Sequence, residues 1–196
     1  MISNILIDAL PDTVEVCGRA IPIRTDYRVG ILFELLLDEP ELSPKEKVLS
    51  ALELWFEQPP QEADEAFRAA MRFYLCGKEP REQQSDTKTK GIAPRIYSFQ
   101  HDAEHIVAAF QSRYGIDLTS VDGLHWWRFR ALFNGLDSST EIMKIMGYRA
   151  VDLSAIKDTH ERERLSRLKA IHALPSVLSN EDKAGQIGSL LAGGLG

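Results

Sequence analysis

Two adjacent tryptophans constrain the fold of this 196-residue chain more than any other feature. They lie in the segment VDGLHWWRFRALFNGL, residues 121–136, whose apolar spacing predicts a helix. Side chains of neighbouring residues on a helix point about 100° apart, so one flat surface cannot cover both indole rings. This helix therefore needs apolar neighbours on two of its sides.

The apolar residues of this segment fall on two faces of the predicted helix. One face consists of Val121, Leu124, Trp127 and Ala131, and the other of Trp126, Phe129, Phe133 and Leu136. The simpler interpretation is a central helix packed between neighbours in the core. We expect Trp127 to be the more buried tryptophan, because Leu124 and Ala131 suit close helix packing, whereas the charged Arg130 lies one turn from Trp126.

The alternative interpretation is that one face of this helix docks onto another chain. Tryptophan and arginine are common in the energetic centres of protein interfaces. The planar guanidinium of Arg130 could stack beside the indole of Trp126, so this pair is the one expected to face a partner. The predicted protein-binding residues are Trp126, Trp127, Arg128, Phe129 and Arg130.

Signals in the first half of the chain predict a hairpin followed by helices. Two short runs with high strand propensity, residues 14–17 and 20–23, are joined by Gly18-Arg19, where glycine favours a tight turn. A helix with a broad apolar surface follows, with Thr25 as its N-cap. We expect this helix to be buried.

Two more helices are predicted before residue 77. Ser43, Pro44 and Glu46 form the start signal of the first, with an N-cap, a proline in the first turn and a capping-box glutamate. The second ends at Gly77. In the second half, helices are predicted on both sides of the tryptophan segment, over residues 103–114, 139–146 and 158–174, with closing glycines at Gly115 and Gly147.

A polar segment separates the two halves. Residues 77–94 have almost no apolar side chains to offset the entropy of ordering them, which predicts a flexible linker. The predicted organisation is a hairpin and acidic helices over 1–76, this linker, a helical domain over 95–175 and a flexible tail over 176–196. The expected fold is mainly α: an N-terminal β-hairpin with three helices, then a second bundle of about four helices.

Charge and cysteine content narrow the class of function. The net charge of -6 argues against a nucleic-acid or anionic-membrane partner, since both usually require a basic surface. Cys17 and Cys76 are too few for a disulfide framework or a thiolate zinc site. The start of the chain lacks the pattern of a signal peptide, and no apolar run reaches the ~18 residues of a membrane span. We therefore expect a cytoplasmic protein.

One short stretch resembles a metal motif. In HDAEH, His101 and His105 have the spacing of the zinc-protease signature, with Asp102 in the place of the glutamate. No third ligand accompanies them, so the preferred interpretation is polar residues on the solvated face of a helix. No nucleophile motif is present either, and the sequence predicts no enzyme activity, no metal and no cofactor.

Several segments together resemble a family of bacteriophage proteins known as gene product fifteen. They are YGIDL, LHWWRFRALFNGL and IMGYRAVDLSAIKD, followed by a charged helix. The resemblance extends through IYSFQHDAEHIVAAFQSRYG and, less sharply, through GRAIPIRTDYRVGILFELLLD. It covers most of residues 15–175.

The resemblance implies a role in building phage tails. In this family the gene lies in the tail module of long-tailed phages and prophages of Gram-positive hosts, close before the tape-measure gene, a position typical of tail assembly chaperones. Such a protein would bind the tape-measure protein, with the tail tube protein as a second partner, in the host cytoplasm, and would be absent from the mature virion. The alternatives are a structural tail component retained in the virion and a metalloenzyme using His101 and His105. The oligomeric state stays open.

Overall fold

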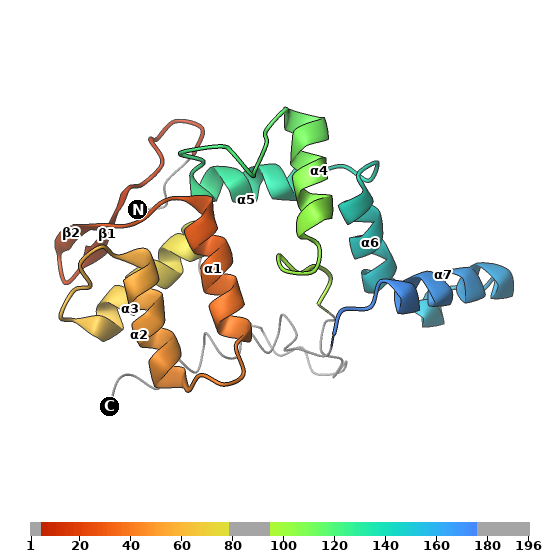
Figure 1. Cartoon of the computed structure of the whole chain (residues 1–196), viewed down its shortest axis with the longest axis horizontal. Helices are drawn as coiled ribbons and strands as arrows, with labels where there is room; N and C mark the ends of the chain where they lie inside the picture. Colours follow the sequence, from red (N-terminus) through yellow and green to blue (C-terminus); the bar gives the residue numbers. More distant parts are fainter. Residues whose placement is uncertain (1–4, 79–94, 176–196) are drawn as a thin grey trace. The chain divides into compact units, whose positions relative to one another are not determined.

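The computed structural model describes residues 5–78 and 95–175. Within these ranges the chain forms one two-stranded sheet, seven α-helices and a short 3-10 helix (Figure 1). In chain order they are β1 (Thr13–Val16), β2 (Arg19–Pro22), α1 (Tyr27–Asp38), α2 (Pro44–Trp55), α3 (Ala63–Tyr74), α4 (Ala103–Tyr114), α5 (Trp126–Asn134), α6 (Glu141–Ala150), η1 (Leu153–Ala155) and α7 (Thr159–Ile171). The predicted mainly α fold, with its N-terminal hairpin, is confirmed.

The hairpin turns one residue earlier than predicted. The strands are antiparallel, with Thr13 opposite Pro22 and Val16 opposite Arg19. The turn residues are therefore Cys17 and Gly18, with φ of 48° and 74°. A two-residue turn of this kind needs positive φ at both positions, and here Cys17 adopts the first of them.

The starts of α1 and α2 show how local signals place helices. The N-cap of α1 is Asp26, whose carboxylate accepts the Arg28 backbone N–H at 2.8 Å; the predicted N-cap, Thr25, was one residue too early. The predicted start of α2 is confirmed, because Ser43 and Glu46 form a reciprocal capping box. Buried Lys47 then donates to the Leu37 carbonyl at 2.8 Å and joins the end of α1 to α2.

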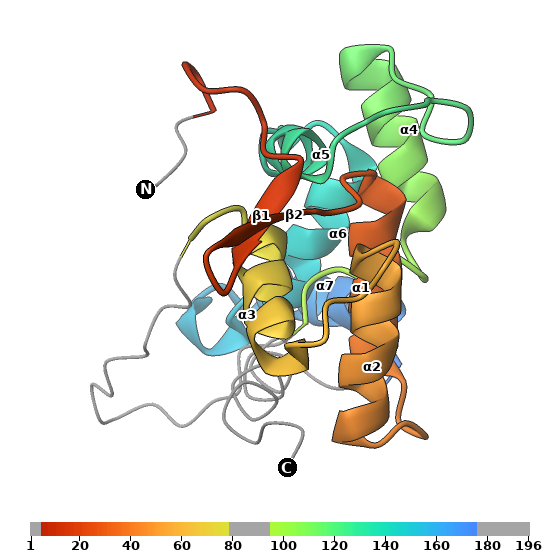
Figure 2. The same cartoon turned by 90° about the vertical axis from the view of Figure 1, so that its left-hand side faces the viewer.

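The described chain folds into two compact units. The first contains residues 5–78 and 122–131, and the second contains residues 95–121 and 132–175. In the first unit α1 packs on α2, α2 on α3, and α3 on β1, as both views show (Figure 1, Figure 2). The tryptophan segment thus groups with the first half of the chain, whereas the sequence pattern placed it with the second.

The other predicted boundaries lie largely outside the described residues. Of the expected linker, only residues 77 and 78 are described, and the expected tail after residue 175 lies outside the described residues altogether. None of the described helices is long and apolar enough to cross a membrane.

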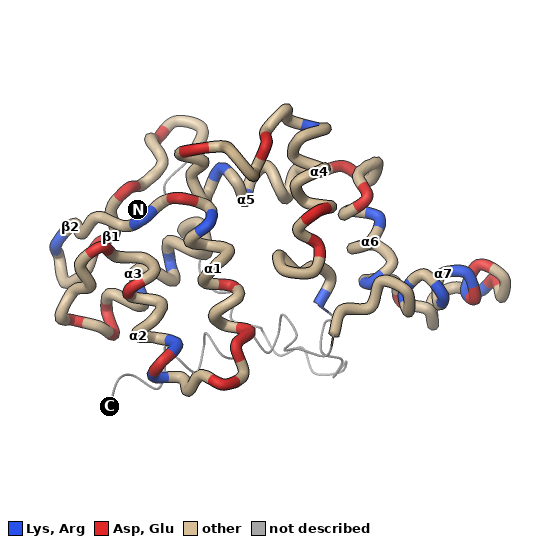
Figure 3. Tube along the Cα trace, in the orientation of Figure 1, with Lys and Arg blue, Asp and Glu red and all other residues tan. Residues whose placement is uncertain are grey.

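In the second unit α4 packs on α6, and α6 on α7. The predicted end of α4 is confirmed, since Gly115 adopts a left-handed conformation with φ of 65°. The predicted end of α6 at Gly147 is wrong, because that glycine keeps helical geometry and the helix continues to Ala150. Asp158 caps α7 by accepting the Glu161 N–H at 2.7 Å, and charges of both signs alternate along this helix (Figure 3).

Candidate functional site

Trp126 lies in the core of the first unit. It is 0% exposed, and its ring stacks on Tyr74 and on Phe129, with centroid distances of 5.5 and 5.7 Å. Its indole N–H donates to the Tyr74 carbonyl at 2.9 Å. The polar edge of the ring is therefore satisfied inside the protein, as is usual for buried tryptophans.

Trp127 makes the matching contact one residue away. It is 6% exposed, and its indole N–H donates to the Phe73 carbonyl at 2.8 Å. The carbonyls in the last turn of a helix have no partner further along that helix. The two adjacent indoles therefore cap two adjacent carbonyls at the end of α3. The prediction that Trp127 is the more buried of the pair is wrong.

Gly30 allows Trp126 to reach this position. A Cβ added to Gly30, in the first turn of α1, would overlap the Trp126 ring, so no larger residue fits without movement. Glycine is unfavourable inside a helix, which makes this one informative. It was not recognised from the sequence, although a lone glycine inside a strongly apolar helix signals a close approach of another group.

Backbone hydrogen bonds fix the tryptophan segment to the start of α1. The Trp126 N–H donates to the Thr25 carbonyl at 2.7 Å, and the Tyr27 N–H donates to the Leu124 carbonyl at 2.9 Å. His125 accepts the Trp127 N–H at its Nδ1, and its Nε2 lies 3.0 Å from the Pro11 carbonyl, so the ring carries its proton on Nε2. These contacts are the reason that residues 122–131 belong to the first unit.

The remaining predicted binding residues on α5 differ in their exposure. Phe129 is fully buried and stacks on Tyr27 at 5.0 Å. Arg130 is half-buried, with its Cζ 5.4 Å from the centre of the Trp126 ring, and Arg128 is exposed. The burial of both tryptophans and Phe129 supports the interpretation of α5 as a core helix.

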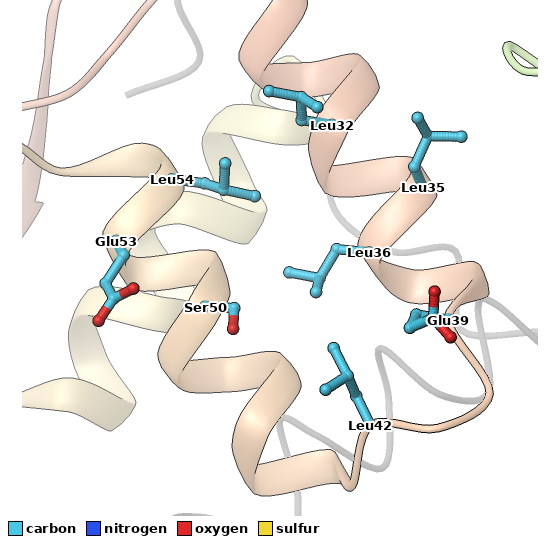
Figure 4. A pocket seen from close by; sticks show the side chains of 8 residues that line it. All are labelled: Leu32, Leu35, Leu36, Glu39, Leu42, Ser50, Glu53 and Leu54. Carbon is cyan, nitrogen blue, oxygen red and sulfur yellow. The ribbon is translucent and has the colours of Figure 1, made fainter.

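An open groove lies between α1 and α2. Its volume is about 510 Å³ (Figure 4). Its lining consists of Leu32, Leu35, Leu36, Glu39, Leu42, Ser50, Glu53 and Leu54. The prediction that α1 is buried holds for only one side of this helix: Leu32 is 49% exposed. The apolar surface of α1 is wider than the face that the core covers, and its outer leucines line the groove.

The charged groups in the groove are acidic. Glu39 caps the end of α1 and Glu53 lies near the end of α2, and the close view places them on opposite sides of the leucines (Figure 4). Of the described residues that line the groove, none is basic. Acidic positions also gather at the end of α1 and in the loop after it (Figure 3).

The second unit contains a buried ion pair between α6 and the start of α4. Arg149 donates to both carboxylate oxygens of Asp102, at 2.6 and 2.9 Å. It also donates to the carbonyls of His172 at 2.6 Å and Ile96 at 3.1 Å. Asp102 accepts the Ser98 backbone N–H at 2.8 Å. One arginine therefore joins α6, the end of α7 and the segment before α4.

This ion pair changes the interpretation of the HDAEH stretch. Burial raises the pKa of Asp102, but hydrogen bonds from Arg149 and the Ser98 backbone outweigh burial and leave this pKa below its ordinary value. Asp102 is thus a structural anion, while His101 is exposed and His105 half-buried. In the part of the chain that the structure describes, no three His, Cys, Asp or Glu side chains form a group suited to hold a metal.

A protein-family model matches residues 6–174 of this chain, and its description is Bacteriophage Gp15 protein. No curated protein and no solved structure matches the chain. The family match spans the described elements of both units, from the hairpin to α7. The chain therefore belongs to the Bacteriophage Gp15 protein family.

Proposed function

We propose that this protein is a tail assembly chaperone that binds the tape-measure protein during tail building and leaves before the particle is complete. Membership in the Bacteriophage Gp15 family supports a structural or tail-related role in a phage. The observation that carries the finer proposal is the open leucine groove between α1 and α2. Exposed apolar surfaces of this kind are typical of sites that bind other proteins.

The physical reason lies in the partner. A tape-measure protein is a long helical chain whose apolar faces need cover until tube subunits surround them. A small helical protein with an exposed apolar groove can cover one such face and then release it. Because Leu32 is already accessible in the folded chain, binding requires no unfolding of the first unit.

In this proposal the protein acts by binding alone, in the host cytoplasm, without a cofactor or a metal. The tail tube protein is the second partner to test. The groove faces outward from a unit whose own core is filled by aromatic side chains, including Phe33, Trp55 and Trp126. Binding and folding are therefore carried by different side chains of the first unit.

Two measurements test the proposal together. The tape-measure protein encoded nearby should co-purify with the tagged full chain when both are expressed, and mass spectrometry of purified particles should not detect the chain. Stoichiometric presence in particles would instead identify a structural tail component. A stoichiometric metal in the purified protein would favour the metalloenzyme and contradict the proposal.

A further inference from the structure

We infer that the groove between α1 and α2 receives one amphipathic helix with leucine-type residues on its inner face and Lys or Arg along both edges. This inference rests on the proposed function, because it takes the occupant of the groove to be part of another protein. It adds the chemical character of the segment that docks there. It follows from the shape of the groove, from its charge and from the way its walls are held.

The walls of the groove favour a helix over an extended segment. Both walls are helices whose own backbone groups are bonded internally, so the groove offers an occupant side chains and no open strand edge. An extended segment pressed into an apolar groove would leave its backbone N–H and C=O groups without partners. A helix satisfies these groups within itself and inserts residues spaced at i, i+3, i+4 and i+7.

The acidic groups specify the edges of the docked helix. Docking removes water from Glu39 and Glu53, which is unfavourable unless opposite charges replace that water. Since the two carboxylates lie on opposite sides of the leucines (Figure 4), basic residues are needed along both edges of the occupant. A helix with acidic edges would be repelled by the same two groups.

The groove is formed before any partner binds. Buried Lys47 ties the start of α2 to the end of α1 through the Leu37 carbonyl. At the other end of α2, Arg24 donates to the carbonyls of Glu53 and Leu54, at 2.5 and 3.1 Å. Walls held at both ends lose little freedom on binding, which favours a fixed partner geometry.

Two other occupants are conceivable, and the charges disfavour both. Residues 176–196 of this chain contain Ile187, Leu190 and Leu191 at helical spacing, but Glu181 and Asp182 outnumber the single base Lys183. A second copy of the chain would bring the same acidic groove face. A basic helix from another protein matches the groove better than either.

The test uses the full chain and two labelled peptides of about 15 residues, enough for about four helical turns. Both carry leucines at i, i+3, i+4, i+7 and i+11, one with lysines and one with glutamates at the edges. Binding is measured by fluorescence anisotropy, and the lysine peptide should bind at least about tenfold more tightly than the glutamate peptide. Equal binding of the two peptides, or none, would overturn the inference.

Matched variants locate the peptide. Leu32→Glu should weaken lysine-peptide binding about tenfold or more, whereas Leu49→Glu, at 44% exposure on α2 but outside the groove lining, should leave it unchanged. Glu39→Lys combined with Glu53→Lys should reverse the peptide preference. Thermal melting of each variant checks that the fold is kept. Equal loss with Leu32→Glu and Leu49→Glu in folded proteins would place the peptide elsewhere.

Two further results would contradict the inference by identifying another occupant. Lysine-peptide binding that appears only after removal of residues 176–196 would place that segment in the groove. A dimer that dissociates on Leu32→Glu would place a second copy there. These experiments distinguish failure of the proposed function from failure of the inference. If the lysine peptide binds but the tape-measure protein does not, the chaperone role is wrong. If the tape-measure protein still binds the Leu32→Glu variant, the groove is not its binding site.

Discussion

Trp126 and Trp127 are adjacent because the carbonyls they bind are adjacent. The Phe73 and Tyr74 carbonyls lie in the last turn of α3 and consecutive indoles donate to them, while the Phe73 carbonyl also accepts the Cys76 backbone N–H at 2.9 Å. Each ring then packs on aromatic neighbours from the same helix end, Trp126 on Tyr74 and Trp127 on Phe73. A helix that is apolar on two sides therefore serves the core of the first unit.

Removing the Trp126 side chain should destabilise the first unit, whereas a partner-facing Trp126 could be removed with little loss of stability. Trp126→Ala should lower the free energy of unfolding by ~3–5 kcal/mol, because it empties a fully buried site. The cost should equal or exceed that of Trp127→Ala, measured by urea denaturation. Arg128→Ala, on the exposed side of α5, is the control and should change stability by less than ~0.5 kcal/mol. A stable Trp126→Ala protein would return the partner-facing interpretation of α5.

For Gly30→Ala, the sign of the stability change tests the packing of Trp126 against α1. Helix propensity alone would make Gly30→Ala stabilising by ~1 kcal/mol. The contact with Trp126 reverses this, since the new methyl group would overlap the ring, and we expect a net loss of ~1–3 kcal/mol. Gly147→Ala is the matched control, because its Cβ would meet nothing within 4 Å, and it should be neutral or stabilising. A gain in stability on Gly30→Ala would contradict the packing described.

The sequence could predict that α5 needs two apolar neighbours, because that follows from helical periodicity. It could not predict which tryptophan is deeper, because this depends on Gly30, nearly one hundred positions away along the chain. Counting the charged neighbour Arg130 as a sign of exposure was misleading. Its guanidinium lies over the Trp126 ring and covers it.

Among the elements, α6 is joined through Arg149 to the end of α7 and to the segment before α4. Arg149→Met should lower the free energy of unfolding by ~3–5 kcal/mol, since Asp102 would remain buried without its counter-charge. Adding Asp102→Ala to Arg149→Met should recover part of this loss. Circular dichroism during urea denaturation measures both. Purely additive losses in the double variant would show that the two groups are not coupled.

The same ion pair predicts a dependence on pH. The folded state lowers the pKa of Asp102, so the resulting stability is present above the ordinary pKa and is lost as pH falls through the lowered one. Below about pH 4, wild type should therefore lose more stability than Asp102→Asn, which has no group to protonate there. The free energy of unfolding of both proteins, measured from pH 7 to about pH 2, tests this. Parallel curves would contradict the lowered pKa.

Local signals predicted elements well where the capping chemistry is explicit. Ser43 and Glu46 identify the start of α2, and Gly115 identifies the end of α4. Gly147 misled, because a glycine ends a helix only where the chain adopts a left-handed conformation there. The role of Arg149 was missed because its partners lie in two segments distant along the chain, the one before α4 and the end of α7.

At the scale of the whole molecule, the fold class was predictable and the grouping of its parts was not. Helical periodicity is local, so the mainly α fold with its hairpin could be read from the chain. Residues 122–131 join the first unit through backbone hydrogen bonds to Thr25 and Tyr27. No local sequence pattern predicts these bonds. The groove was missed for the same reason: only the packed core shows which face of α1 stays uncovered.

The central proposal, which rests on the family and the groove, is that this phage protein uses the groove between α1 and α2 to hold a helix of the tape-measure protein. The most direct test is co-purification of that protein with tagged wild type, Leu32→Glu and Leu49→Glu, all shown to be folded. The account predicts that wild type and Leu49→Glu retain the tape-measure protein and that Leu32→Glu loses it. Equal recovery with all three, or with none, would contradict it.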